Sequence, residues 1–302
     1  MTSPHHIARD LETVVGIPAL PYQSDGAIDV RTSRRLATRL VDSGLSVLTA
    51  NGNTGEFYAL SPAERRTARD ALLEAVGDHA TIITGVGLDL HTATTEARAA
   101  AEAGVNGIMV HQPVLPYLSP SGWVDYVATV ASAVPDLAVL PYVSSAKIGG
   151  AQVSELVRRC PNVVGLKYSV PDPVDFARTV RESEAALVWI AGLAENYAAS
   201  AWQSGARAFT SGLVNVFPRL SLDLLDALRD ANLPRVTQLQ DAISEFEAMR
   251  AHNGSANNVS VVKEAMHQLG LCDRSVRPPS AVLSDAERAG ISRMITEWGL
   301  TA

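Results

Sequence analysis

Eight short apolar runs alternate with Ala-rich amphipathic stretches along the first 210 residues of this 302-residue chain. The runs are almost continuously apolar, which indicates strands that are buried on both faces. Strands that alternate regularly with helical windows predict parallel pairing in an α/β fold. The eight predicted strands cover residues 15–20, 45–50, 81–85, 106–110, 138–142, 163–168, 187–191 and 207–210.

Eight regular units predict a closed (β/α)8 TIM barrel, although a doubly wound open sheet is the alternative. The barrel is favoured because no G-x-G-x-x-G follows the first strand and because eight units close naturally. We expect the barrel over residues 1–215, with C-terminal helices over 216–302 packed on it as one structural unit. Those helices are predicted at 217–231, 234–251, 257–270 and 284–298, with prolines at the breaks.

Composition narrows the possible partners. Hydrophobic residues make up 47% of the chain and charged residues 19%, which predicts a compact, soluble protein with a large core. A net charge of −7 with no basic run argues against nucleic acid as a partner.

No signal peptide and no apolar stretch of about 18 residues is seen, so we expect a cytoplasmic protein without membrane contact. Cys160 and Cys272 have no metal-ligand spacing, and neither a metal nor a cofactor is expected.

Lys167 lies near the end of the sixth predicted strand, VVGLKY, where its ammonium falls in a segment suited to a dry core. Burying an unpaired charge is costly, so we expect this lysine to be paired or to have a lowered pKa. A neutral amine in this setting can condense with a ketone and give an iminium ion, as in class I aldolases. The alternatives are a strand that turns outward here, or an ion pair with a buried carboxylate such as Glu56.

A glycine-rich turn with the sequence ANGNTGE, residues 50–56, follows the second predicted strand directly. Barrel enzymes place their ligand-binding groups at this end of the strands. Gly52 and Gly55 let the backbone approach a ligand, and the N–H groups of such a turn can point at an anion. The turn therefore predicts a carboxylate-binding site, with a purely structural turn as the alternative.

Three further strand ends carry polar groups. Tyr142 ends the fifth predicted strand, beside the strand of Lys167, so its hydroxyl can transfer protons in the same cavity, or its ring can serve only in packing. Gly192 and Glu195 follow the seventh strand, where a carboxylate suits the hydroxyl groups of a sugar-like substrate or simply the first turn of a helix. His111 follows the fourth strand, and we expect a structural hydrogen-bonding role for it.

Together these residues resemble the dihydrodipicolinate synthase and N-acetylneuraminate lyase superfamily over nearly the whole chain. GIPALPYQSDGAID is similar to the first strand and turn of that family, and NGNTGEFYALSPAERR to its carboxylate-binding signature with the helix that follows. The resemblance implies that Lys167 forms a Schiff base with a keto acid and that Tyr142 relays protons. It also implies that the amides of Asn53 and Thr54 bind the keto-acid carboxylate and that the Thr54 hydroxyl couples to the tyrosine.

The sequence departs from the synthase members of that family. They carry a hydroxylic residue where this chain has Asn53, and an arginine where it has Lys147, five residues after Tyr142. Lysine keeps the charge of arginine but loses its bidentate geometry. The synthases also use a tyrosine of the strand-four loop, for which Tyr117 stands out of register. These departures disfavour a role in lysine biosynthesis.

Other positions are similar to those of sugar-acid enzymes. Glu195 falls where the sugar-acid lyases place a hydroxyl-binding glutamate, and Ser169 where they carry a hydroxylic residue, while GNTGEFYALSP is similar to the keto-deoxy sugar acid dehydratases. The resemblance thus favours cleavage or dehydration of a 2-keto-3-deoxy sugar acid, as in 5-dehydro-4-deoxyglucarate dehydratase. The expected catalytic residues are Lys167, Tyr142 and Thr54, and the expected substrate-binding residues are Gly52, Asn53, Gly55, Lys147, Ser169, Gly192, Glu195 and Ser211.

Two alternatives stay open beside such a lyase. One is a dihydrodipicolinate synthase, which condenses pyruvate with an aspartate-derived aldehyde. The other is a non-catalytic barrel that binds a keto acid, because a fold alone does not establish a reaction. The joint presence of Lys167, Tyr142 and Thr54 favours the enzyme, because a pure binder would not need all three. The resemblance also implies a homodimer or a homotetramer.

Overall fold

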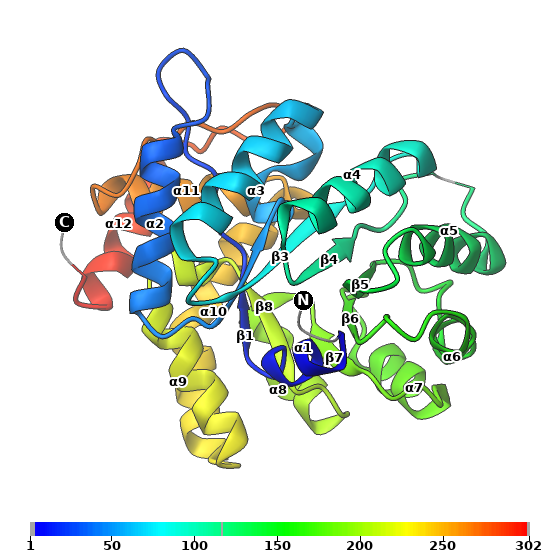
Figure 1. Cartoon of the computed structure of the whole chain (residues 1–302). Helices are drawn as coiled ribbons and strands as arrows, with labels where there is room; N and C mark the ends of the chain where they lie inside the picture. The colour runs from blue at the N-terminus through cyan, green and yellow to red at the C-terminus, as the bar shows by residue number, and fades with distance from the viewer. Residues whose placement is uncertain (1–3, 116, 301–302) are drawn as a thin grey trace. The chain divides into compact units, whose positions relative to one another are not determined.

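The parallel strands of the computed structural model follow one another in hydrogen-bonded order from β1 to β8 and close into a barrel (Figure 1). The structure describes residues 4–115 and 117–300. The predicted (β/α)8 barrel is therefore confirmed, and the open sheet is not formed. The strands are β1 (Val14–Gly16), β2 (Val47–Ala50), β3 (Thr81–Val86), β4 (Gly107–Val110), β5 (Ala138–Val143), β6 (Gly165–Tyr168), β7 (Val188–Ala191) and β8 (Ala208–Ser211).

Helices separate the strands, and their capping residues show why they begin where they do. At Ser61 the hydroxyl accepts from the Glu64 N–H while the Glu64 carboxylate accepts from the Ser61 N–H, which is the expected capping box. The helices of the barrel segment are α1 (Pro4–Asp10), α2 (Val30–Asp42), α3 (Pro62–Val76), α4 (Leu90–Ala103), α5 (Pro120–Ser132), α6 (Gly150–Arg159), α7 (Pro173–Glu182) and α8 (Ala194–Gln203), with 3₁₀ turns η1 (Asn53–Gly55), η2 (Phe57–Ala59) and η3 (Leu213–Asn215).

Within residues 216–300 the structure has four helices, as the prolines and the helical periodicity predict. They are α9 (Pro218–Arg229), α10 (Leu233–Ser255), α11 (Asn258–Gln268) and α12 (Asp285–Glu297). Inside α10 the backbone is non-helical at His252, Asn253 and Gly254, so the regular helix stops at the predicted end, residue 251. None of the helices in the described part of the chain has both the length and the apolar character needed to cross a membrane.

The chain divides by its internal contacts into two compact units. The first unit joins Met1–Val15 to Thr81–Thr210, and the second joins Gly16–Ala80 to Ser211–Ala302. The boundary expected between residues 215 and 216 marks the change from alternating strands and helices to helices alone. The division by contacts is different, because it places the C-terminal helices in one unit with α2 and α3.

In the first unit, strands β3 to β7 form a continuous parallel ladder with α4 to α8 outside it (Figure 1). Each of these strands is buried along almost its entire length, as expected for parallel strands covered on both faces. The N-terminal helix α1, which the sequence reasoning did not predict, packs near β5. The ladder fixes which residues stand side by side at the strand ends.

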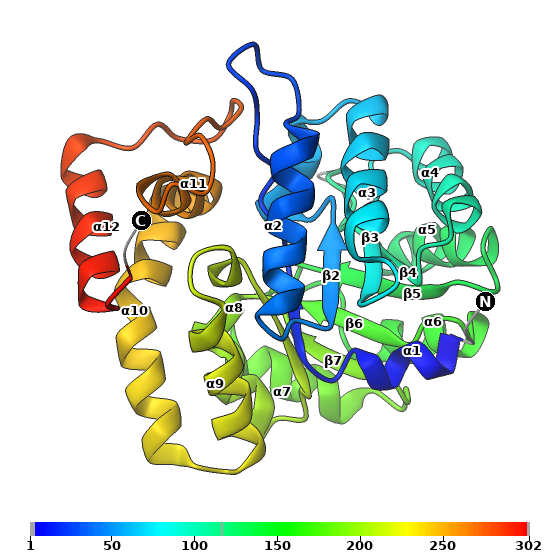
Figure 2. The ribbon, with the colours of Figure 1, turned by 60° about the vertical axis from the view of Figure 1, so that its left-hand side comes forward.

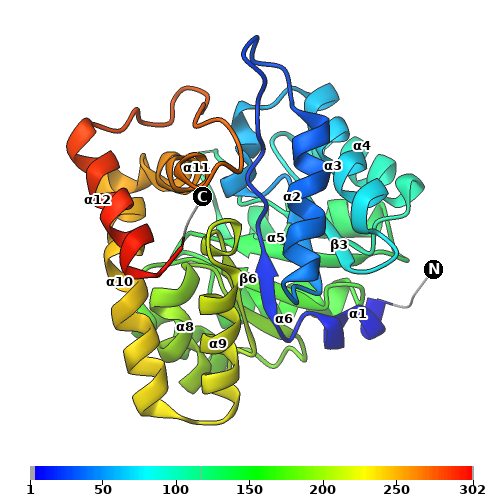
Figure 3. The same cartoon turned by 90° about the vertical axis from the view of Figure 1, so that its left-hand side faces the viewer.

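In the second unit, α2 lies beside α3, and α10 packs on α9, α11 and α12 (Figure 2 and Figure 3). An apolar cluster joins α10, α11 and α12, with Phe246 of α10, Val262 of α11 and Ile291 of α12 all fully buried. The same cluster includes Leu213 of η3, which follows β8. The C-terminal helices are thus part of the core that supports the loops of this unit.

The first strand is shorter than predicted. Residues 17–20 are buried or half-buried, but they lie outside the strand. The Ile17 N–H donates to the Ser211 carbonyl oxygen at 2.9 Å, and the Ala19 N–H donates to Asn215 Oδ1 at 2.9 Å. A side-chain amide therefore replaces the strand partner, which an apolar run in the sequence does not reveal.

Candidate active site

Lys167 of β6 and Tyr142 of β5 are register partners in neighbouring parallel strands. The lysine side chain is buried, at 5% exposure, and its Nζ lies 4.4 Å from the centroid of the Tyr142 ring. The alternative in which the strand turns outward at Lys167 is therefore wrong. An ammonium at this distance over an aromatic ring is stabilised by the ring quadrupole, while burial disfavours its charged form.

The carboxylate considered as a partner for Lys167 is engaged elsewhere. Glu56 Oε2 lies 2.6 Å from Lys263 Nζ, within the second unit. Lys263 belongs to α11 and is completely buried. The buried lysine that neutralises Glu56 is thus Lys263.

Gly192 brings the end of β7 against Lys167 and Ser169. A Cβ atom at Gly192 would lie 2.0 Å from Ser169 Oγ and 2.9 Å from Lys167 Cγ, which leaves no room for any other residue. The Ser169 hydroxyl is buried and has no hydrogen-bond partner within the described ranges. A buried hydroxyl of this kind is a ready donor or acceptor for a bound ligand.

Two more polar side chains belong to this end of the first unit. Glu195, in the first turn of α8, is fully buried, so it is more than a solvated helix-end residue. His111, directly after β4, is also buried and its ring stands edge-on to Tyr142, with the centroids 5.9 Å apart. The hydroxyl of Thr210 donates to the Gly192 carbonyl oxygen at 3.3 Å and so ties β8 to this loop.

Lys147 and Tyr117 differ from these buried groups. Lys147 is exposed in the loop after β5, and its N–H donates to Ser145 Oγ at 3.4 Å. Tyr117 is 88% exposed in the loop after β4. In this structure, neither side chain is held among the buried polar groups of the first unit.

In the second unit, the glycine turn after β2 forms the 3₁₀ turn η1 (Asn53–Gly55). A Cβ atom at Gly52 would lie 2.5 Å from Ile17 Cγ2, so the close approach of two loops requires glycine there. Within the turn, the Gly55 N–H donates to the Gly52 carbonyl oxygen, and the Glu56 N–H donates to the Asn53 carbonyl oxygen. No backbone acceptor is seen for the Thr54 N–H among the residues described, which leaves this amide suited to an anion.

Buried amide side chains brace this turn from two sides. Asn51 has a left-handed backbone, and its Nδ2 donates to the Arg65 carbonyl oxygen of α3 at 2.9 Å. Asn215 of η3 is buried, and its Nδ2 donates to the carbonyl oxygens of Ile17 and Gly212, both at 2.9 Å. The sequence reasoning did not single out Asn215, because a lone asparagine after a strand carries no distinctive pattern.

A buried guanidinium also reaches this region. A Cβ atom at Gly212 would lie 2.5 Å from Arg250 Nη2 and 3.1 Å from Thr54 Oγ1, so both groups flank the residue that follows β8. Arg250 of α10 is itself held by Glu247 at 2.6 Å and by Asn258 at 2.7 Å. The sequence reasoning missed Arg250, because its helix lies far along the chain from Thr54.

Ser211, expected to bind substrate, has partners inside the protein. Its side chain is fully buried, and its Oγ lies 3.1 Å from the Ser221 hydroxyl of α9. It also accepts from the Val214 N–H at 3.2 Å. These bonds give Ser211 a role in joining β8 to α9, and substrate binding by this residue stays a prediction.

The chain matches the model of the Dihydrodipicolinate synthetase family over residues 10–298. The chain belongs to this family. A probable 5-dehydro-4-deoxyglucarate dehydratase from Saccharopolyspora erythraea is 30% identical, and the alignment covers 99% of this chain and 97% of that protein. The resemblance seen in the sequence is confirmed, and the chain is a lyase rather than a non-catalytic keto-acid binder.

Two solved structures of dihydrodipicolinate synthase share the fold over the whole length. The protein from Oceanobacillus iheyensis superposes with a TM-score of 0.94 at 32% identity, covering 98% of this chain and 99% of that one. The protein from Bacillus clausii superposes with a TM-score of 0.93 at 35% identity, covering 97% and 100%. The barrel and its C-terminal helices are thus the family architecture.

Proposed function

We propose that this lyase binds a 2-keto-3-deoxy sugar acid as a Schiff base on Lys167 and dehydrates it. The observation that carries the proposal is the buried lysine at a strand end with its Nζ 4.4 Å over the ring of Tyr142. An amine held in a dry site beside a proton-transferring hydroxyl is the arrangement that carbonyl condensation requires.

In the proposed reaction, Lys167 Nζ adds to the ketone carbon and forms a carbinolamine. Tyr142 delivers the proton with which the carbinolamine hydroxyl leaves as water, giving an iminium ion. The iminium withdraws electrons, so the neighbouring carbon loses a proton and an enamine forms. The enamine electrons then expel the hydroxyl of the next carbon as water, and hydrolysis of the imine frees Lys167.

The keto-acid carboxylate is assigned to the glycine turn of the second unit. We propose that the amides of Asn53 and Thr54 bind it, with Gly52 and Gly55 keeping the backbone accessible, and that the Thr54 hydroxyl takes part in proton transfer. The unused Thr54 N–H supports this assignment. Backbone amides bind anions well because they are preorganised and need no further ordering.

The polyhydroxylated part of the substrate is assigned to Ser169 and Glu195. Both side chains are buried in the first unit, and Gly192 packs directly against Ser169 and Lys167, where a Cβ atom would clash with Ser169 Oγ. A site with buried hydrogen-bonding groups selects strongly for substrates that satisfy them. The similarity to a probable 5-dehydro-4-deoxyglucarate dehydratase supports the same substrate class.

The test is turnover with a panel of keto acids, followed by mass spectrometry of the products. We expect 2-keto-3-deoxy sugar acids to lose water, and Ser169→Ala to slow them while leaving the condensation of Lys167 with pyruvate unchanged. Turnover of pyruvate with aspartate semialdehyde, and no reaction of any sugar acid, would instead establish the synthase alternative. The two dihydrodipicolinate synthase structures make that reaction the second candidate.

A small-molecule keto acid is then the partner of this chain. The homodimer or homotetramer that the resemblance implies stays a prediction. Sedimentation velocity at micromolar concentration would test it directly.

A further inference from the structure

Glu56 follows the glycine turn directly and is anchored by two segments from the end of the chain. Its backbone is left-handed, with a φ of 58°, and its side chain is buried at 4% exposure. Oε2 accepts from Lys263 Nζ at 2.6 Å, and Oε1 accepts from the Arg277 backbone N–H at 2.7 Å. Each carboxylate oxygen therefore has its own donor, and the residue that terminates η1 is fixed at both oxygens.

Lys263 has contacts beyond its ion pair with Glu56. Its Nζ also donates to the Ser275 carbonyl oxygen at 2.7 Å and lies 3.9 Å from the centroid of the Tyr22 ring. Burial lowers the pKa of Lys263, and the neighbouring Glu56 charge opposes that shift. Because both charges are out of water, neither can leave the other without a large penalty.

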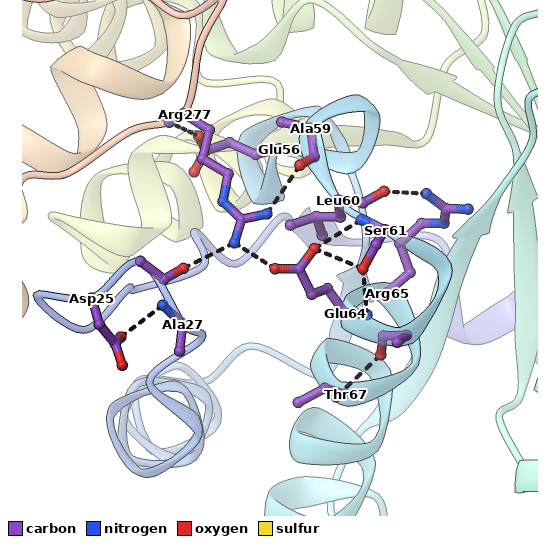
Figure 4. Close-up of polar contacts among 12 residues, drawn as sticks. Asp25, Ala27, Glu56, Ala59, Leu60, Ser61, Glu64, Arg65, Thr67 and Arg277 are labelled. Atoms are coloured by element: carbon purple, nitrogen blue, oxygen red, sulfur yellow. Dashed lines mark hydrogen bonds and ion pairs between the residues drawn. The ribbon is translucent and has the colours of Figure 1, made fainter.

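Arg277 extends the anchorage to the far side of the turn (Figure 4). Its guanidinium donates to the carbonyl oxygens of Ala59 in η2 and of Gly26, both at 3.0 Å, and pairs with Glu64 of α3. It also lies 4.5 Å from the centroid of the Tyr22 ring. One arginine of the C-terminal segment thus connects the loop before α2, the turn η2 after β2, and the start of α3.

We propose that Glu56 is a positioning residue, through which Lys263 and Arg277 set the direction of the Asn53 and Thr54 amides toward the substrate carboxylate. The turn binds with backbone groups alone, so its affinity depends on where its N–H groups point. A displacement of about 1 Å at such a site can cost two orders of magnitude in rate. The inference rests on the proposed function, because it presumes that this turn binds the keto-acid carboxylate.

The test is a titration of Lys167 adduct formation with pyruvate, measured by intact mass after borohydride reduction. For Glu56→Gln we expect the half-saturating pyruvate concentration to rise about tenfold or more, with the adduct still complete at saturation. Glu264→Gln is the matched control. Glu264 follows Lys263 in α11 and is as buried as Glu56, but its carboxylate pairs with Arg274 and Arg288. This control should keep the wild-type half-saturation.

A ketone without a carboxylate separates positioning from general damage. Hydroxyacetone does not need the turn, so Glu56→Gln and the wild type should form its adduct equally well. A loss of both adducts in Glu56→Gln would mean that the residue only maintains the fold, and would overturn the inference. An unchanged pyruvate half-saturation would overturn it as well.

If Glu56→Gln does not fold because Lys263 keeps an unpaired charge, the double variant Glu56→Gln with Lys263→Met removes that charge. The same rise in half-saturation is expected of the double variant, and a wild-type value would contradict the inference. Absence of a pyruvate adduct on the wild-type protein is a different outcome. It would refute the proposed function itself rather than the role of Glu56.

Discussion

Tyr142 and Lys167 are paired across two parallel strands, with the lysine Nζ over the tyrosine ring at 4.4 Å. The pairing is set by backbone register, so it does not depend on flexible loops. The tyrosine ring lies against the amine, and the lysine side chain is buried. In the proposed mechanism, the nucleophile and the proton donor are therefore both placed by paired strands.

Tyr142→Phe keeps the ring over Lys167 and removes only the hydroxyl. We expect the rate of adduct formation with pyruvate to fall by about 10²- to 10⁴-fold, the usual contribution of a general acid or base. The final yield of reduced adduct should still reach that of the wild type. Quenched-flow trapping with borohydride measures both quantities.

Tyr168→Phe is the matched control for that variant, because Tyr168 is next to Lys167 on β6. Its hydroxyl bonds to Asp175 of α7, on the helix side of the strand. The control should keep the wild-type rate. Equal slowing by both variants would contradict the relay role of Tyr142.

Gly192→Ala tests the close packing over Lys167. The new methyl group would meet Ser169 Oγ at 2.0 Å and the Tyr168 carbonyl oxygen at 2.8 Å, and the backbone oxygen cannot move aside easily. We expect adduct formation to slow by about tenfold or more because the lysine is displaced. Gly290→Ala, where the nearest side-chain atoms are 3.8 Å away inside α12, should leave the rate unchanged, as measured by the same trapping assay.

The first unit could be predicted well because its site lies on strand ends. Apolar runs locate the strands, and a strand order that follows the sequence places Tyr142 beside Lys167. In the second unit, the apolar run at 17–20 is harder to interpret. The N–H groups of Ile17 and Ala19 donate to the Ser211 carbonyl oxygen and to Asn215 Oδ1, and no local pattern distinguishes this run from a strand.

The second unit could be predicted only in part. The turn at 52–55 is visible in the sequence, but Lys263 and Arg277 lie 207 and 221 positions after Glu56. Lys263 stands in the apolar helical run VSVVKEAM, which is the same signal that identified Lys167, a charge in a segment expected to be buried. A search for every such lysine would have found it, although its partner would still have required the structure.

Lys263→Met should be strongly destabilising, because it leaves the Glu56 carboxylate buried without its cation. We expect a loss of about 3 to 5 kcal/mol in the free energy of unfolding, the usual cost of removing one partner of a buried pair. The double variant Glu56→Gln with Lys263→Met should recover much of that loss. Urea denaturation followed by circular dichroism gives the free energy of unfolding of the wild type, of Lys263→Met and of the double variant. Equal stability of Lys263→Met and the double variant would contradict the coupling between Glu56 and Lys263.

The ion pair of Glu64 and Arg277 predicts that the free energy of unfolding falls as the pH is lowered into the acid range. The hydrogen bond from Arg277 lowers the pKa of Glu64 to about 2, with the Ser61 cap acting in the same direction and burial opposing it. A lowered carboxyl pKa stabilises the fold at pH values above the ordinary pKa of 4.5, and this contribution disappears as the pH falls toward 2. Glu64→Gln should therefore be less stable than the wild type at pH 7.

The stability difference between wild type and Glu64→Gln should shrink between pH 5 and pH 3. Thermal unfolding at each pH measures it, with the exposed Asp241→Asn as the control that should follow the wild type throughout. A difference that stays constant over this range would show that the ionised form of Glu64 contributes nothing.

Borohydride trapping with peptide mapping tests the central claim most directly. The protein is incubated with pyruvate and with a 2-keto-3-deoxy sugar acid, reduced, digested and examined by mass spectrometry. The account predicts a reduced adduct on Lys167, its absence in a Lys167→Ala protein that keeps the wild-type circular dichroism spectrum, and no adduct on Lys147 or Lys263. An adduct on another lysine, or none with any keto acid, would contradict it.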